Sequence, residues 1–118
     1  DVCVPISKLS DCIIETIEDM EKNELIGPIV SHAGDGNFHV ALLIDKKNQV
    51  ELDKLDSFLV RISERAIRMN GTCTGEHGVG QGKRKYMLKE LGNAVDVMKK
   101  VKNAFDPNKI MNPGKLFL

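Results

Sequence analysis

A short glycine-rich segment at residues 33–36, with the sequence AGDG, constrains the fold of this chain most. It lies between two runs of residues with a high content of apolar side chains. Glycine adopts the positive backbone dihedral angles of a tight turn at little cost, and aspartate can bond its own backbone in an Asx turn. The segment therefore predicts a β-hairpin made of residues 29–32 and 37–45.

Two histidines flank this turn. If residues 33–36 form a four-residue turn, His32 lies opposite Asn37, and His39 lies two residues further along the same strand face. Diagonal neighbours in a sheet are about 7 to 8 Å apart, a separation that lets two imidazoles converge on one metal ion. The spacing permits a metal site, while a plain hairpin with two incidental histidines is the alternative. The other face of the second strand is apolar, through Phe38, Val40, Leu42 and Ile44.

Helical periodicity predicts two amphipathic helices. The first begins with Ser7 as its N-cap and ends near Asn23. The second ends at Asn70-Gly71. Its apolar stripe consists of Leu52, Leu55, Leu59, Ile62, Ala66 and Met69.

The last third of the chain is expected to add a strand and two helices. The strand covers residues 72–76, and a basic helix begins near Lys83 and ends at Gly92. A capping box of Asn93 with Asp96 predicts the final helix, which Asp106-Pro107 ends. Its inward-facing residues are expected to be Ala94, Met98, Val101 and Phe105.

The resulting element order, β-α-β-β-α-β-α-α, predicts an α+β fold in which helices cover one face of a mainly antiparallel sheet, like half of a ferredoxin-like cap, followed by a helical C-terminus. One face of the sheet is left without a helix. Both hairpin histidines belong to that face, where an enzyme places polar chemistry.

Composition narrows the possible partners. The 118 residues carry 17 basic and 17 acidic side chains, so no net charge favours nucleic acid or an anionic membrane. An odd number of cysteines, 3, favours a reducing compartment. No apolar run approaches the roughly 20 residues of a membrane span, so we expect a soluble domain. A strand at residues 2–5 without a preceding methionine suggests a fragment of a longer protein.

A second glycine-rich segment, residues 75–82, contains Glu76 and His77. Two histidines and one carboxylate are a recurrent ligand set for a catalytic metal, which leaves coordination positions open. His77 would then be available as an acid or base. A Walker A loop does not fit, because His77 and Arg84 occupy two of its defining positions, and the dinucleotide-binding fingerprint is absent too. The basic run at residues 83–85 reads as a solvated helix start, and Cys73 as a packed thiol.

Three motifs resemble one known family. They are SHAGDGNFH at residues 31–39, CTGEHGVG at 73–80 and NPGK at 112–115. In this order they resemble the C-terminal domain of FAD-linked oxidases, the family of cytochrome-type D-lactate dehydrogenases, glycolate oxidases and D-2-hydroxyglutarate dehydrogenases. The resemblance implies that residues 1–118 are the C-terminal part of a cap and substrate domain, without the FAD-binding domain and without an arginine that grips the substrate carboxylate.

The resemblance also assigns roles to residues. It implies that His32, His39 and Glu76 bind zinc or manganese, that His77 is the general base, and that Asn112 approaches the flavin. Ala41, where hydroxyglutarate enzymes carry a polar residue, favours D-lactate as the substrate, with glycolate and D-2-hydroxyglutarate as alternatives. The implied reaction is metal-assisted proton abstraction with hydride transfer to FAD.

Partners and location are implied in the same way. They include an FAD-binding domain or subunit and an electron-acceptor protein or quinone, in the bacterial cytoplasm or in mitochondria, at a membrane only through partners. Two other readings remain open: a metal-binding or subunit-interaction module without turnover, and a small metal-dependent hydrolase. We expect the isolated chain to be inactive as a dehydrogenase.

Overall fold

The computed structural model describes residues 1–117. The chain forms two compact units, Asp1–His77 and Gly78–Leu118. The first contains the sheet and the two long helices, and the second contains short helices and turns.

The sheet of the first unit has three strands, β1 (Val2–Cys3), β2 (Ile29–His32) and β3 (Asn37–Val40), in the order β1-β3-β2. Both pairings are antiparallel, and β2 and β3 form the predicted hairpin. The short 3-10 turn η1 (Ala33–Asp35) joins them and ends at Gly36 with φ 74°. A Cβ atom on Gly36 would lie 2.0 Å from the carbonyl oxygen of Val4, so the turn requires glycine there.

The return strand is shorter than predicted. It ends at Val40 rather than at residue 45. The backbone beyond it still bonds to the segment before β2, since Ala41 N–H donates to Pro28 O at 3.0 Å and Leu43 N–H to Ile26 O at 2.8 Å. The alternation of apolar side chains therefore continues past the regular strand, and Leu42 and Ile44 still pack against the core.

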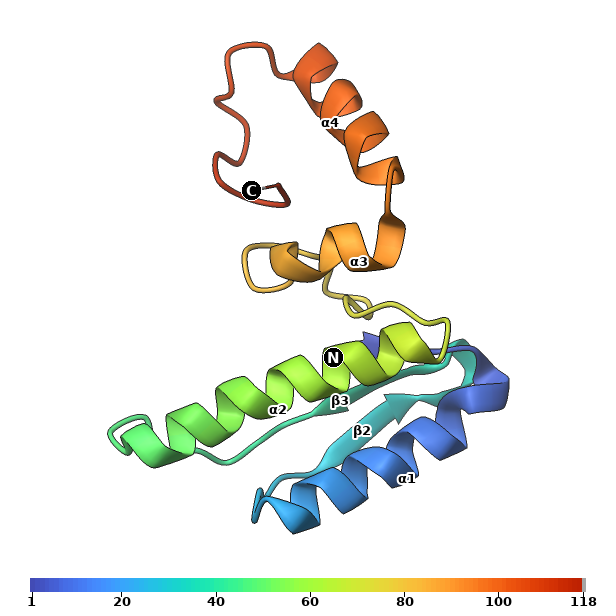
Figure 1. Ribbon diagram of the computed structural model, residues 1–118, viewed down its shortest axis with the longest axis vertical. Coiled ribbons are helices and arrows are strands. Elements are labelled where there is room, and N and C mark those ends of the chain that lie inside the picture. The colour runs from blue at the N-terminus through green and yellow to red at the C-terminus, as the bar shows by residue number, and fades with distance from the viewer. Residues whose placement is uncertain (118) are drawn as a thin grey trace. The chain divides into compact units, whose positions relative to one another are not determined.

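Helices α1 (Ile6–Lys22) and α2 (Gln49–Arg68) supply the other side of the core. Figure 1 shows them running along the sheet. The cluster that they form with the strands is apolar and buried. It includes Val2, Leu9, Cys12, Phe38, Phe58, Ile62 and Ala66. Helices on a small antiparallel sheet confirm the predicted α+β class.

Ion pairs join the two helices beside this core. The carboxylate of Asp19, 7% exposed, accepts hydrogen bonds from Arg61 Nε at 2.9 Å and from Arg65 Nη2 at 2.8 Å. Burial alone would raise the pKa of Asp19, but the hydrogen bonds and charges of the two guanidinium groups outweigh it and lower this pKa below its ordinary value. Asp19 therefore stays ionised and holds α1 to α2.

Two details of the predicted helices are wrong. Helix α1 begins after Pro5, which is its N-cap, and Ser7 lies inside the helix. Proline suits this position because it has no backbone N–H to leave unpaired at the helix start. On α2 the buried position is Phe58, 1% exposed, whereas Leu59 is 40% exposed. The larger ring occupies the core, and the apolar stripe is rotated by one residue at this point.

The strand expected at residues 72–76 is also wrong. A single bridge pairs Cys3 with Thr72, and turns follow. Gly75 has φ 54°, a left-handed conformation that a β-strand does not contain. The segment is a loop that carries Glu76 and His77.

The second unit contains η2 (Arg84–Tyr86), α3 (Met87–Leu91) and α4 (Ala94–Phe105). Gly92 ends α3 and Asp106 follows α4, as predicted. The expected capping box is wrong, since Asn93 is itself helical and its side chain makes no cap. The expected inward face is wrong as well, because Val95 is buried whereas Val101 is 52% and Phe105 is 81% exposed.

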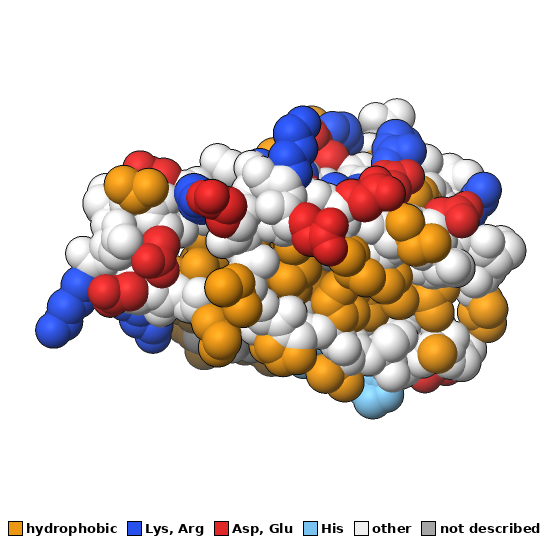
Figure 2. All heavy atoms as spheres, turned by 90° about the horizontal axis from the view of Figure 1, so that it is seen from below, with side chains coloured by type: hydrophobic (Ala, Val, Ile, Leu, Met, Phe, Trp, Pro, Cys, Tyr) orange, Lys and Arg blue, Asp and Glu red, His pale blue; other side chains and the backbone are white. Residues whose placement is uncertain are grey.

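Apolar side chains also reach the surface of the chain. Figure 2 shows them gathered in a band across the middle of one face, with charged side chains above the band. Exposed apolar residues of the first unit include Ile17, Ile26, Val30 and Leu43. Within residues 1–117, no helix has the length and apolar character needed to cross a membrane.

Candidate metal site

The hairpin brings the two predicted histidine ligands together. His32 pairs with Asn37, and His39 lies two residues further along β3, so both imidazoles occupy the sheet face opposite Phe38. Their ring centroids are 5.6 Å apart. This register is the one that the four-residue turn predicts.

Glu76 completes a three-residue cluster. Its Oε1 lies 3.1 Å from His39 Nε2 and 3.4 Å from His32 Nε2. Metal–ligand bonds of about 2.0 to 2.2 Å place tetrahedral ligand atoms about 3.4 Å from one another. The donor atoms of the three residues all lie within 4.8 Å of one another, so they fit one divalent ion. With His32 56% and Glu76 50% exposed, the site is open to a further ligand from solution.

His77 lies beside this cluster. Its Nε2 is 3.9 Å from Glu76 Oε1, too far for a hydrogen bond. Its other ring nitrogen, Nδ1, is 3.2 Å from Asp1 Oδ2, and its ring centroid is 5.2 Å from that of His39. The ring is 68% exposed. His77 is thus held on one side and open to solvent on the other.

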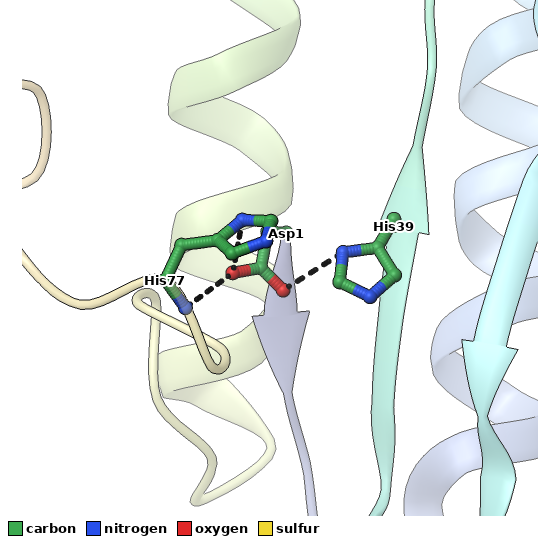
Figure 3. A group of neighbouring side chains, drawn as sticks. All are labelled: Asp1, His39 and His77. Atoms are coloured by element: carbon green, nitrogen blue, oxygen red, sulfur yellow. Dashed lines mark hydrogen bonds and ion pairs between the residues drawn. The ribbon is translucent and has the colours of Figure 1, made fainter.

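Asp1 is a member of the site that sequence reasoning missed. Figure 3 shows its carboxylate between the imidazoles of His39 and His77. The register Val2 with Phe38, continued by one residue, places Asp1 opposite His39. An acidic residue directly before a strand was the available signal, but the pairing of β1 with β3 was needed to interpret it.

A second set of donor atoms, from Asp1, His39 and His77, is also compact. The carboxylate of Asp1 already accepts hydrogen bonds on both oxygens. Asn37 Nδ2 donates to Oδ1 at 2.9 Å, and the backbone N–H of His77 donates to Oδ2 at 3.2 Å. Asp1 is also only 11% exposed. The set of His32, His39 and Glu76 is therefore the better candidate for a metal site.

The other residues that the sequence singles out have surroundings of their own. Asn112 belongs to the second unit, where it is exposed, has φ 48° and accepts a hydrogen bond from Lys115 N–H at 3.2 Å. Cys73 is 1% exposed, as the packed-thiol interpretation predicts. Arg84 donates to Gly114 O at 2.8 Å, which makes it a structural tie in the second unit. Ala41 is exposed beyond β3.

Comparison with known proteins defines the class of the chain. It belongs to the family of FAD linked oxidases, C-terminal domain, whose family model matches residues 1–116. This membership confirms the resemblance found in the sequence motifs.

Individual relatives are similar along almost the whole chain. A probable mitochondrial D-lactate dehydrogenase of Danio rerio is 49% identical over 117 residues, which cover 98% of this chain and 24% of that protein. The mitochondrial D-lactate dehydrogenase [cytochrome] 1 of Saccharomyces cerevisiae is 50% identical over 99% of this chain and 20% of its own length. Glycolate oxidase subunit GlcD of Bacillus subtilis is 40% identical over 99% of this chain and 25% of its length. The chain thus spans between 20% and 25% of these relatives.

Proposed function

We propose that this chain is the C-terminal, metal-binding part of an FAD-dependent oxidoreductase that converts a D-2-hydroxy acid to the 2-oxo acid. The observation that carries the proposal is the convergence of His32, His39 and Glu76 beside His77. Relatives named as D-lactate dehydrogenases support D-lactate as the substrate. Glycolate and D-2-hydroxyglutarate are the alternatives, since relatives carry these names as well.

In this proposal His32, His39 and Glu76 hold zinc or manganese. The metal, when bound, orients the hydroxyl group of the substrate and lowers the pKa of that hydroxyl. Three protein ligands leave room for the hydroxyl and carboxylate oxygens of a 2-hydroxy acid. The open side of the cluster is consistent with such access.

His77 is the proposed general base. Because its Nδ1 faces the carboxylate of Asp1, its Nε2 is the atom that takes the hydroxyl proton. A flavin bound beside the substrate would supply the hydride acceptor: the electron pair of the C–H bond would pass to it as the C–O bond becomes a carbonyl. The task of this chain is to position the substrate and receive the proton.

The proposal requires an FAD-binding domain or subunit as a partner, with Asn112 approaching the flavin. An electron-acceptor protein or quinone would reoxidise the reduced flavin. The mitochondrial names of several relatives, and the presence of bacterial ones, support a mitochondrial or bacterial location.

The experiment that tests the role of His77 is anaerobic stopped-flow reduction of the flavin by D-lactate in the complete enzyme. His77→Ala should retain metal and FAD while flavin reduction slows by a factor of about 10² to 10⁴, the usual contribution of a positioned base. The matched control is Gln81→Ala, another exposed residue of the same glycine-rich segment. Reduction of His77→Ala at the rate of the control would exclude His77 as the base.

The same preparation separates this proposal from its rivals. A metal-dependent hydrolase or a non-catalytic binding module needs no flavin, so the complete protein would lack the visible absorbance of oxidised flavin. Bleaching of that absorbance by D-lactate supports the oxidoreductase.

A further inference from the structure

We infer that Asp1 is a positioning residue that orients two imidazoles at once, those of the metal ligand His39 and of the base His77. The inference rests on the proposed function, because Asp1 acts only through these two residues. Its Oδ1 lies 3.3 Å from His39 Nδ1, and its Oδ2 lies 3.2 Å from His77 Nδ1. One carboxylate thus bridges a strand residue and a loop residue (Figure 3).

The carboxylate of Asp1 is itself held in place. Asn37, 4% exposed, donates from Nδ2 to Asp1 Oδ1 at 2.9 Å and to Val2 O at 3.3 Å. On the other side, the backbone N–H of His77 donates to Oδ2 at 3.2 Å. These donors fix the plane of the carboxylate independently of the two imidazoles.

Gly75 provides the space that the carboxylate occupies. A Cβ atom on this residue would lie 2.0 Å from Asp1 Oδ1, and its φ is 54°. Both the close approach and the left-handed backbone require glycine. Glycine at position 75 therefore allows the loop that carries Glu76 to pack against the carboxylate of Asp1.

The arrangement determines which ring nitrogen is available in each histidine. A carboxylate accepts hydrogen bonds, so each imidazole presents its Nδ1–H to Asp1 and leaves the lone pair of Nε2 for other chemistry. In His39 that Nε2 is 3.1 Å from Glu76 Oε1 and belongs to the metal cluster. In His77 the same atom is 3.9 Å from Glu76 Oε1, beside the cluster, where a base is needed. Asp1 therefore selects the ligand atom of one ring and the basic atom of the other.

Asp1→Asn in the complete flavoprotein tests this inference. The amide keeps the size of the side chain. It replaces one of the two acceptor oxygens with an NH₂ group, which then faces the N–H donors that this oxygen bonded. Zn²⁺ affinity is measured by competition with a chromophoric chelator, and it should fall by about 10- to 100-fold, the usual effect of losing such a carboxylate. At saturating Zn²⁺, kcat should fall while KM changes little, because the base is misoriented and the substrate ligands remain.

A control variant makes the result specific. Asp11→Asn removes the same charge from an exposed position on α1 and should leave Zn²⁺ affinity and kcat unchanged.

The possible failures are distinguishable. Zn²⁺ affinity in Asp1→Asn equal to that of Asp11→Asn overturns the inference alone. Loss of Zn²⁺ as complete as in His39→Ala also overturns it, since Asp1 would then be a ligand. A wild-type protein that binds neither Zn²⁺ nor Mn²⁺ contradicts the proposed function, and the inference falls with it.

Discussion

Asp19→Asn is the substitution that most directly tests how the first unit is held together. Asp19 lies on α1 and accepts hydrogen bonds from Arg61 and Arg65 of α2. The asparagine has nearly the same shape but no charge, so the variant removes the electrostatic attraction and leaves the packing of the helices intact.

The magnitude follows from the exposure of the partners. Arg61 is 36% exposed as a whole, although its Nη2 atom, 2.7 Å from Asp19 Oδ1, is buried, and Arg65 is 10% exposed. In Asp19→Asn, Arg65 keeps two contacts, to Glu15 Oε2 at 3.3 Å and to Thr16 Oγ1 at 3.0 Å. Its charge is therefore not left buried without a partner. The cost should therefore be below the roughly 3 to 5 kcal/mol of a fully isolated buried charge, at about 2 to 3 kcal/mol.

The pH dependence has a definite sign. The folded-state pKa of Asp19 is lowered, so the contribution of its carboxylate is complete above the unfolded pKa of about 3.9. This contribution is lost as the pH falls through the folded pKa. The wild type should therefore exceed Asp19→Asn in stability at pH 7, and the difference should shrink below about pH 4.

The assay is urea unfolding followed by far-UV circular dichroism at pH 7 and at several acidic pH values. Glu24→Gln is the matched control, because Glu24 is 84% exposed in its pair with Lys54, and its loss should leave the unfolding midpoint almost unchanged. A difference between wild type and Asp19→Asn that is equal at pH 7 and pH 3, or equal to that of the control, would refute the reasoning.

Two other predictions follow from the fold and the proposed division of the enzyme. Phe58→Ala should destabilise the chain by about 3 to 5 kcal/mol in the same urea assay, because Phe58 fills the core. Leu59→Ala should cost much less, and equal costs for the two variants would contradict the observed buried face of α2. The isolated chain should retain no FAD through gel filtration and show no dehydrogenase activity, since the proposed cap supplies little of the cofactor site; stoichiometric flavin on the purified chain would contradict this.

Much of the first unit could be predicted from its sequence because the local signals agree with the tertiary packing. The AGDG turn predicts the hairpin and its register, and apolar periodicity predicts both long helices. The structure of the second unit was harder to predict. Its sequence supports several helix faces, and the exposure of Phe105 contradicts the expectation that large apolar side chains lie inward.

The candidate site was predictable where it depends on local geometry. The pair His32 and His39 follows from the turn length alone. Asp1 does not, because its role depends on the pairing of β1 with β3 and on Gly75, two contacts between distant parts of the sequence. The predicted strand at residues 72–76 failed for a related reason, since only Thr72 pairs with Cys3 and the loop that follows closes against Asp1.

The metal content of the complete protein tests the central claim most directly. Wild type, His39→Ala and His77→Ala are loaded with Zn²⁺, dialysed and analysed by mass spectrometry for metal per chain, with FAD content measured in parallel. The account predicts stoichiometric metal in the wild type and in His77→Ala, and its loss in His39→Ala with flavin retained. Equal metal content in all three proteins would contradict the assignment of His32, His39 and Glu76 as the metal site.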